Sequence, residues 1–341
     1  MSSEATALDH VREGIAALRS GDLEAARQRF DQAIGQDPGH APAHWHRGGV
    51  AWRSGRWAEA ASHFDRARHL DPANPGYAVD AASAHYRAGA LAVAGECCEA
   101  ALALHPNIDA AYQMLSEVRL PGPGYLELLP RIIDRLRPRT YLEIGVASGD
   151  SIARLPAGVR AIGIDPEPAI SHPLPPTTSI VPATSDEYFA THDVRAELGG
   201  LPVDVAFIDG MHRFEFALRD FANLERHCAP GSTILIHDCC PLDRLTAERE
   251  RQTGFWSGDI WRLVVALRRF RPDLAVNVIA TAPTGLGVVR RLDPASRLLE
   301  REYAGIIEEM LEVDYAVLDG DRAGLLGLCA NDWPRIDQLL A

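Results

Sequence analysis

The first residues able to do chemistry are an acid and two glycines in the pattern Glu143-x-Gly145-x-x-x-Gly149, followed by a second acid, Asp165. Glycine lets the backbone come close to a ligand, because it carries no side chain. A negative charge at Glu143 suits a cationic ligand better than a diphosphate, and an acid placed like Asp165 can hold the hydroxyls of a ribose. The four residues therefore predict a site for a ribose-containing ligand that carries positive charge.

The elements that must position these residues are a strand, a glycine turn, a helix and a second strand. Tyr141–Ile144 is a short apolar run bounded by Gly145, and Gly149 marks the opening of the helix. Val159–Ile164 is a second run with strand composition, closed by Asp165. Such a βαβ unit predicts a parallel sheet.

Two other interpretations of this turn remain open. A dinucleotide-binding turn reads G-x-G-x-x-G, so that the backbone can approach a pyrophosphate. Ala147 lies inside the pattern here, which disfavours an NAD-dependent oxidoreductase without excluding it. The second alternative is an ordinary βαβ turn that binds no cofactor.

A second group of polar residues follows two further apolar runs. Val203–Ile208 ends at Asp209, and Thr233–Ile236 ends at His237 and Asp238. Ligands of open α/β sheets bind at the carboxyl edge of the strands, so these side chains are expected beside the first glycine turn.

The chemistry of this group depends on whether it holds a metal. Two carboxylates, with water and substrate hydroxyls, suit a hard divalent cation such as Mg²⁺, which would lower the pKa of an acceptor hydroxyl. Without a metal, His212 or His237 could remove the proton directly, because histidine titrates near neutral pH. In the alternative interpretation His212 caps a helix and His237 only packs at a strand end. Cys239 and Cys240 lack the C-x-x-C spacing of structural zinc.

The order of acid, glycines, acid, I-D-G-x-H, P-G and H-D resembles class I S-adenosylmethionine-dependent methyltransferases. It is similar to a subgroup that acts on secondary metabolites and sugars. The resemblance implies a Rossmann-like doubly wound sheet of strand order 3-2-1-4-5-7-6, and transfer of a methyl group, chiefly to oxygen, on a small-molecule, sugar or peptide acceptor. The cofactor contacts it implies are Glu143, Gly145, Ala147, Gly149, Asp165, Ser185 and Asp209.

The same resemblance bears on the metal. Related O-methyltransferases hold magnesium with an acid after the fourth strand and a D-D or D-N pair after the fifth, so Asp209 and Asp238, with His237, become candidate ligands. Two positions depart from the pattern. His237 stands where the relatives have an acid, and Met211 stands where I-D-G-D enzymes have their proposed base.

A 34-residue repeat precedes these motifs, over residues 7–40, 41–74 and 75–108. The copies share glycine, alanine and proline positions, namely Gly21, Gly55 and Gly89; Ala26, Ala60 and Ala94; Ala33, Ala67 and Ala101; and Pro38, Pro72 and Pro106. This resembles the tetratricopeptide repeat, a pair of helices, with a terminal cap at residues 109–118. The family implies a protein partner or self-association through an all-α stack.

Composition limits the partners and the chemistry. All 34 basic residues are arginine, which excludes Schiff-base and P-loop lysine mechanisms, and a net charge of −13 disfavours nucleic acid. Six cysteines without a disulfide framework are typical of a reducing cytoplasm. No apolar run reaches the roughly 18 residues that a membrane span needs, and no signal core is visible, so we expect a cytoplasmic protein.

We expect three regions: the repeats at 1–120, a methyltransferase domain at 121–293 after a Pro-Gly linker, and a helical extension at 294–341. Within the second region, one face of a helix is expected to carry Ala217, Phe221, Leu224 and Cys228. Residues 242–254 should form a mobile surface segment, and Ser257 should cap the next helix. Phe255, Trp256 and Trp261 are candidates for an acceptor pocket or lid, with ordinary packing as the alternative.

The main hypothesis is therefore an S-adenosylmethionine-dependent methyltransferase fused to tetratricopeptide repeats. Its rival is a repeat scaffold with an inactive Rossmann-like domain, and transfer to nitrogen is a variant of the main hypothesis.

Overall fold

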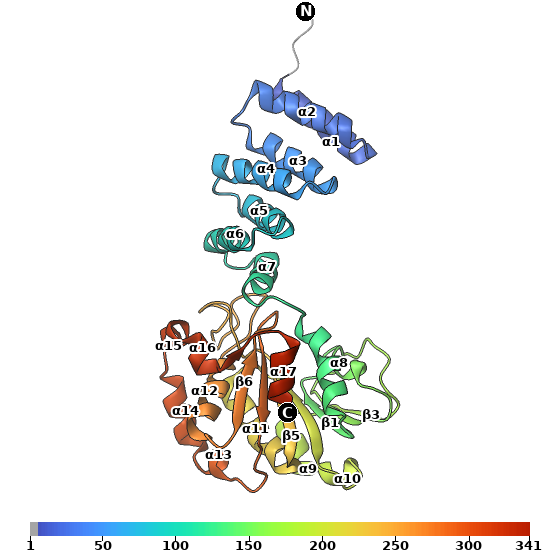
Figure 1. The fold of residues 1–341 in the computed structure, drawn as a ribbon, viewed down its shortest axis with the longest axis vertical. Coiled ribbons are helices and arrows are strands. Elements are labelled where there is room, and N and C mark those ends of the chain that lie inside the picture. Colours follow the sequence, from blue (N-terminus) through green and yellow to red (C-terminus); the bar gives the residue numbers. More distant parts are fainter. Residues whose placement is uncertain (1–5) are drawn as a thin grey trace, which may run out of the picture. The chain divides into compact units, whose positions relative to one another are not determined.

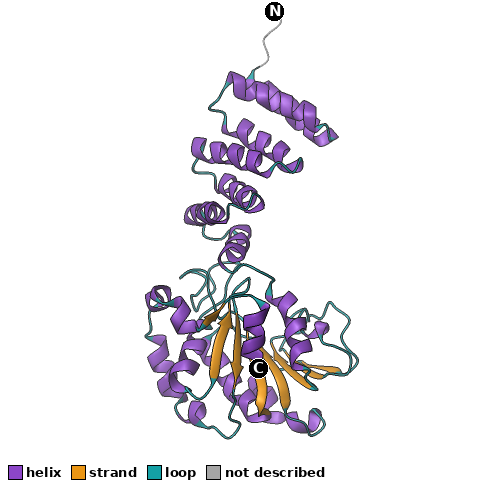
Figure 2. Cartoon of the chain, viewed as in Figure 1, coloured by secondary structure: helices purple, strands orange, loops and turns teal. Residues whose placement is uncertain are grey.

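The computed structural model describes residues 6–341, and contacts along the chain divide it into two units. The first runs to Arg119 and includes Thr253–Phe255, and the second comprises Leu120–Gln252 and Trp256–Ala341. The first unit is helical, whereas the second is built around a sheet (Figures 1 and 2). Every helix among the described residues is too short or too polar to span a bilayer.

The first unit confirms the tetratricopeptide stack. Its helices are α1 (Ala7–Ser20), α2 (Leu23–Gln36), α3 (Ala41–Arg53), α4 (Trp57–Leu70), α5 (Pro75–Arg87), α6 (Leu91–Leu104) and α7 (Asp109–Arg119). Small residues allow the close packing within a pair: a Cβ added to Gly14 would lie 2.5 Å from the ring of Phe30, and one at Gly48 would lie 2.7 Å from Phe64. The repeated small and aromatic positions are thus a packing requirement.

The second unit is an eight-stranded sheet of order β3-β2-β1-β4-β5-β7-β6-β8. Its strands are β1 (Thr140–Ile144), β2 (Arg160–Ile164), β3 (Thr178–Val181), β4 (Val203–Ile208), β5 (Cys228–Ile236), β6 (Ala275–Ile279), β7 (Leu286–Arg290) and β8 (Leu328–Cys329). The predicted order of the first seven strands is confirmed, including the antiparallel β6–β7 hairpin. The tail adds β8, parallel to β6, which was not predicted.

Helices bury both faces of this sheet. One face carries Tyr141 and Phe207, which share a core with Ile132 of α8 (Tyr125–Leu136) and Ile336 of α17 (Trp333–Leu340). The alternate residues along the strands, such as Leu142, are buried too and face the other way. The remaining helices are α9 (Ser185–Thr191), α10 (Val194–Glu197), α11 (Phe214–His227), α12 (Trp261–Phe270), α13 (Leu298–Arg301), α14 (Tyr303–Leu311), α15 (Tyr315–Gly320) and α16 (Arg322–Leu326).

Two local predictions in the sheet unit are wrong. No α-helix follows Gly149, because Pro156 disfavours helical backbone just before it and leaves room only for a single 3₁₀ turn, Ile152–Arg154. Cys228 does not lie on the face of α11, since the helix ends at His227 and Cys228 begins β5.

The segment before α12 also differs from expectation. Ser257 does not cap the helix, which starts at Trp261; its hydroxyl donates to the carbonyl oxygen of Thr246 instead. Residues 242–254 are not a purely surface segment either, because Thr246 is buried and Arg249 forms an ion pair with buried Asp259. Asp259 in turn accepts the backbone N–H of Phe214 at the start of α11. This carboxylate therefore links the segment around Arg249 and the start of α11 to the loop before α12.

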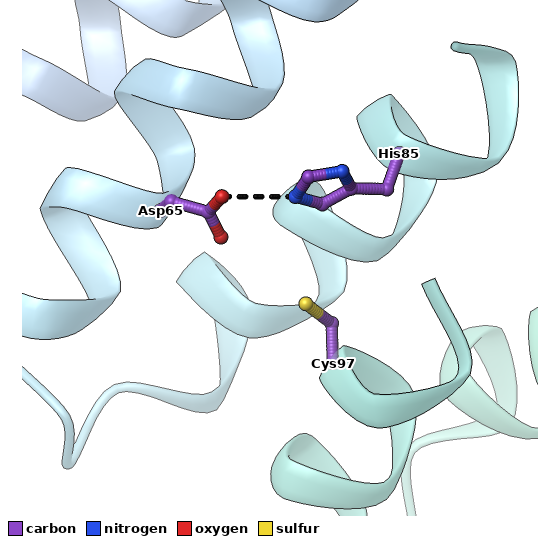
Figure 3. Close-up of side chains that lie close together, drawn as sticks. All are labelled: Asp65, His85 and Cys97. Atoms are coloured by element: carbon purple, nitrogen blue, oxygen red, sulfur yellow. Dashed lines mark hydrogen bonds and ion pairs between the residues drawn. The ribbon is translucent and has the colours of Figure 1, made fainter. Parts of the chain in front are cut away.

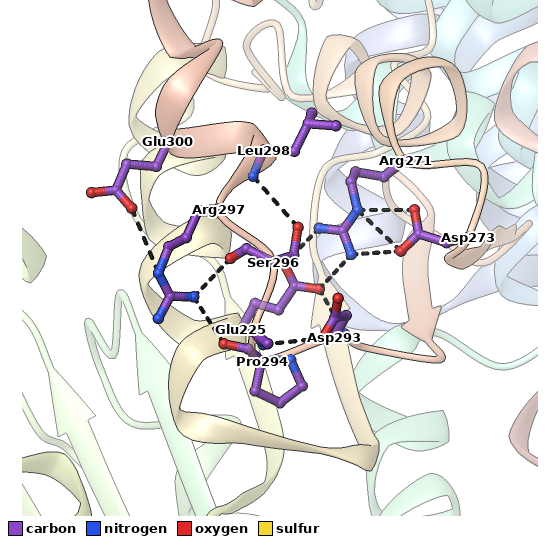
Figure 4. A network of polar contacts seen from close by, with 10 residues as sticks. Glu225, Arg271, Asp273, Asp293, Pro294, Ser296, Arg297, Leu298 and Glu300 are labelled. Atoms are coloured by element: carbon purple, nitrogen blue, oxygen red, sulfur yellow. Dashed lines mark hydrogen bonds and ion pairs between the residues drawn. The ribbon is translucent and has the colours of Figure 1, made fainter.

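A buried ion pair holds α11 to the end of α12. The side chains of Arg271 and Glu225 are 2% and 4% exposed, and two hydrogen bonds of 2.7 and 2.9 Å join them. Asp273 accepts from the same guanidinium, and Glu225 also accepts the backbone N–H of Asp293 (Figure 4). The buried guanidinium of Arg271 thus has two carboxylate partners, and buried Glu225 has a guanidinium and a backbone N–H, so both buried charges are compensated.

Removing one partner of this pair should destabilise the second unit strongly. We expect Glu225→Gln to lower the free energy of unfolding by about 3 to 5 kcal/mol, because Arg271 would remain buried with half its compensation. Urea unfolding measures the change. The control is Glu300→Gln, whose carboxylate is 52% exposed beside Arg226 and which should change stability by less than about 0.5 kcal/mol. Equal effects of the two variants would contradict the role of burial.

Candidate functional site

Four parallel strands end level with one another at the carboxyl edge of the sheet. The pairing register aligns Ile144 with Ile164 and Ile208, and Ile208 with Ile236. The residues that follow these isoleucines therefore form one row: Gly145, Asp165, Asp209 and His237. The predicted meeting of these side chains at one edge follows directly from this register.

A cavity of about 480 Å³ lies over part of this row. Six of the predicted site residues line it: Gly145, Ala147, Asp165, Ser185, Asp209 and His212. Its volume falls in the range of about 300 to 1,000 Å³ that is typical of small-molecule sites. Glu143, Gly149, His237 and Asp238 do not line this cavity.

Gly145 stands at a position that leaves no space for a side chain. Its φ is +87°, and a Cβ would lie 2.1 Å from the carbonyl oxygen of Asp209. The close approach arises because the Asp209 N–H donates to the Ile144 carbonyl oxygen at 2.8 Å, drawing the ends of β1 and β4 together. Ala147 also adopts a left-handed conformation, with φ of +46°.

Asp165 holds the glycine turn and keeps capacity for a ligand. Its Oδ2 accepts the N–H of Ala147 at 2.8 Å, and its Oδ1 accepts the N–H of Glu167 at 2.8 Å. The side chain is only half-buried, and each carboxylate oxygen can accept a second hydrogen bond. The residue can therefore bind two ligand hydroxyls while it orders the loop.

Glu143 is an interior carboxyl group. It is fully buried, accepts a hydrogen bond of 2.7 Å from the Tyr141 hydroxyl and is also bonded by the Ser151 hydroxyl. Burial raises its pKa to about 8, although both hydrogen bonds oppose the shift. The group is therefore largely protonated at neutral pH and brings no charge to the cavity.

This pKa makes stability depend on pH. Glu143 keeps its proton in the folded chain up to about pH 8, whereas the unfolded chain loses it near 4.5. Unfolding thus becomes easier as pH rises through that window, by up to about 1.4 kcal/mol per pH unit from this group. We expect Glu143→Gln, which resembles the protonated form, to gain stability relative to the wild type between about pH 5 and pH 8. Urea unfolding measures the stability of both proteins at each pH. A constant difference between their free energies of unfolding across this range would contradict the raised pKa of Glu143.

A cluster of two acids and two histidines adjoins the cavity, and Asp209 and His212 belong to both. Nδ1 of His237 lies 3.0 Å from Asp209 Oδ1 and 3.4 Å from Asp238 Oδ2, and Nδ1 of His212 lies 3.0 Å from Asp238 Oδ2. Burial lowers the pKa of His237, but the two carboxylates outweigh it and raise that pKa well above its usual value. Burial would raise the pKa of Asp238, but His237, His212 and the Thr284 hydroxyl hold it below its usual value.

The donor set of this cluster fits a divalent cation. Ligand atoms of Asp209, His237 and Asp238 lie within 4.8 Å of one another, and two carboxylates with an imidazole are donors that such ions accept. A small cavity of about 10 Å³ beside them has room for one water molecule.

His212 differs from His237 in its access to the main cavity. Its ring stacks on Trp256, with centroids 5.1 Å apart and planes inclined by 11°. The His237 ring instead packs on Tyr125 at 4.1 Å, and its Nε2 is buried without a hydrogen-bond partner. Of the aromatic pocket candidates, Trp256 contacts His212 but does not line the cavity, and Trp261 is packed in the interior.

Comparison with protein families agrees with this geometry. Residues 142–239 match the model of a methyltransferase domain. Two models of the tetratricopeptide repeat match residues 11–75 and 51–117. The chain joins tetratricopeptide repeats to a methyltransferase domain. No curated protein matches the chain.

Solved structures similar to the chain include three tetratricopeptide domains. The first domain of Spaghetti (RPAP3), bound to an HSP90 peptide, is 21% identical with a TM-score of 0.32, over 33% of this chain and 90% of that one. The second domain of human RPAP3, in complex with an HSP70 peptide, is 22% identical with a TM-score of 0.32, over 33% and 93%. The N-terminal domain of stress-induced protein-1 from C. elegans is 18% identical with a TM-score of 0.31, over 33% and 93%.

Sequence reasoning missed one acid in the methyltransferase domain. Asp220 lines the main cavity although it is only 3% exposed, and its Oδ1 has no hydrogen-bond partner. Burial raises its pKa to about 7, although Ser185 bonds to it. The signal was present in the sequence, because this acid stands next to Phe221 on the apolar side of α11, where a buried hydrophobic residue is the norm.

Proposed function

We propose that the chain transfers a methyl group from S-adenosylmethionine to an oxygen of a small-molecule, sugar or peptide acceptor. The observation that carries the proposal is the row of Gly145, Asp165 and Asp209 around a cavity of about 480 Å³ in a methyltransferase domain. The cofactor supplies a methyl group on a positively charged sulfur, and the residues of this chain supply the rest.

The residues of the cavity fit such a cofactor. Asp165 holds the ribose through the free lone pairs of its carboxylate, beside the turn that it orders. Ser185 and the unpartnered Oδ1 of Asp220 lie near the end of β3 and receive the adenine. Gly145 and Asp209 flank the methionine part, and the missing Cβ of Gly145 lets the ends of β1 and β4 approach each other there. Glu143 and Gly149 do not line the cavity, and their proposed role is to fix the conformation of the glycine turn.

His212 is the proposed base, because it lines the cavity and His237 does not. Asp238 is ionised, and its Oδ2 lies 3.0 Å from Nδ1 without the geometry of a hydrogen bond. The negative charge of Asp238 favours a proton on Nδ1, so Nε2 is the nitrogen proposed to accept one. Nε2 of His212 would accept the proton of the acceptor hydroxyl, whose oxygen would take the methyl group in place of the sulfur, with the electron pair of the broken bond left on the cofactor. Orientation of the two reactants supplies much of the rate.

Metal assistance belongs to the same proposal. Asp209, His237 and Asp238 would hold a Mg²⁺ or similar ion, which would lower the pKa of the acceptor hydroxyl. We expect chelation with EDTA, or Asp238→Asn, to lower turnover by about tenfold or more, and added Mg²⁺ to restore the chelated wild type. Full turnover after chelation would exclude a metal ion from the mechanism, and His212 would then act as the base alone.

Calorimetry tests the function itself. S-adenosylmethionine should release or absorb heat on binding the wild type, and the signal should be lost in Asp165→Ala. NAD should give no signal. Absence of binding to the wild type, or equal binding by the variant, would favour a repeat scaffold with an inactive domain. Binding of NAD would favour the oxidoreductase.

The repeats are proposed to bind a protein partner or a second copy of the chain, as such repeats commonly do. We propose residues 1–120, 121–293 and 294–341 as its three regions, and the cytoplasm as its location. Transfer to nitrogen is the variant that only product analysis distinguishes.

A further inference from the structure

Three side chains that bind metals in other proteins meet inside the repeats. Asp65 on α4, His85 on α5 and Cys97 on α6 each direct one donor atom to the same point (Figure 3). Nε2 of His85 lies 2.9 Å from Asp65 Oδ2, and all three donor atoms lie within 4.8 Å of one another. Three consecutive helices thus supply one ligand each.

The repeat itself shows that a histidine at position 85 and a cysteine at position 97 are not required by the packing, whereas the Asp65 position is an acid in all three copies. The position of His85 is alanine in the other two copies, at Ala17 and Ala51. The position of Cys97 is Arg29 in the first copy and a histidine in the second. The combination of an acid, a histidine and a cysteine therefore arises at one junction only.

The surroundings of the trio suit a bound ion. Cys97 is 1% exposed, whereas Asp65 and His85 are partly accessible, so an ion could enter from the solvent side. Arg68 donates to the other carboxylate oxygen of Asp65 at 2.8 Å, which orients Oδ2 toward His85. Such hydrogen bonds to a ligating carboxylate are usual around protein metal sites.

We propose that Asp65, His85 and Cys97 bind a zinc ion that links the second and third repeats. A thiolate, an imidazole and a carboxylate are zinc ligands, and the sulfur excludes magnesium and calcium. The carboxylate and the thiolate together balance the charge of the ion, and water completes a tetrahedral shell. Binding displaces the proton of the Cys97 thiol to solvent as the zinc–sulfur bond forms.

The required movement is small. Donor atoms around a tetrahedral zinc lie about 3.3 to 3.8 Å apart, given bond lengths of about 2.0 to 2.3 Å. The Asp65 and His85 atoms must therefore separate slightly, and the Cys97 sulfur must approach them by up to about 1.3 Å, which side-chain rotation supplies.

Cobalt reports on this site because it absorbs strongly in the near ultraviolet when a thiolate binds it. We expect the metal-free full chain to take up about one equivalent of Co²⁺ with such a band, and Zn²⁺ to abolish the band. Cys97→Ser should lose the band, and His85→Ala should weaken cobalt binding more than about tenfold. Alanine at the His85 position is compatible with the fold, since two copies already carry it.

Two controls separate this site from others. Cys98→Ser removes the neighbouring buried thiol and should keep the band, as should Asp238→Asn, which removes a ligand of the other candidate cluster. No thiolate band in the wild type, or an undiminished band in Cys97→Ser or His85→Ala, would overturn the proposal. None of these results depends on methyl transfer.

Discussion

Gly145→Ala should abolish the binding of S-adenosylmethionine. The added Cβ would lie 2.1 Å from the carbonyl oxygen of Asp209, and backbone atoms cannot yield there without parting β1 from β4. The left-handed φ of +87° adds a strain of about 1 to 2 kcal/mol. Because the same movement displaces two walls of the cavity, we expect affinity to fall by about a hundredfold or more, measured by calorimetry.

Gly149→Ala is the matched control. Gly149 has the same φ of +87°, but its Cβ would meet only the side chains of Ile170 and Leu174, at 3.3 Å and beyond. The Gly149→Ala variant therefore has the backbone strain without the steric clash. Its affinity for S-adenosylmethionine should fall by about tenfold at most. Circular dichroism should show both variants folded. Equal losses of affinity in the two variants would contradict the argument from the close approach.

His212→Ala should remove most of the methyl transfer while cofactor affinity stays near that of the wild type. A positioned general base contributes about 10² to 10⁴ to a rate, so we expect kcat to fall within that range. Product formation measured with saturating S-adenosylmethionine gives kcat, and calorimetry gives the affinity separately.

His192→Ala is the control for loss of a histidine. His192 directly follows α9 and forms an ion pair with Glu197 of α10. It does not line the cavity. It should leave turnover unchanged. A His212→Ala enzyme with wild-type kcat would exclude this residue as the base and leave the acceptor to be activated in another way.

The sheet was predictable because its strands can be recognised by their length and their apolar composition. Among the parallel strands, β1, β2, β4 and β5 each contain a short apolar run followed by a glycine, an acid or a histidine, and both faces of these runs are buried, so the runs are continuous. The ends of these runs also located the site, since residues after level strands must meet. The repeats were predictable for a related reason: Phe30 and Phe64 need small partners, and the same spacing recurs in each copy.

Two of the errors concern acids that the fold buries and that the sequence analysis placed elsewhere, Asp259 and Glu143. Asp259 resembles a residue of a first helical turn, yet it is buried and binds Phe214 and Arg249. Glu143 looks like a charge for the cofactor, but the hydroxyl groups of Tyr141 and Ser151 keep it in the interior. The burial of these two acids depends on the elements that pack around them, which a short stretch of sequence does not reveal.

The most direct test is a crystal structure with S-adenosylhomocysteine, the product of methyl transfer. Its ribose hydroxyls should lie within about 2.5 to 3.0 Å of the Asp165 carboxylate, with the thioether sulfur beside Gly145 and Asp209. A cavity that stays empty at saturating ligand, or a ligand bound away from this edge of the sheet, would contradict the account.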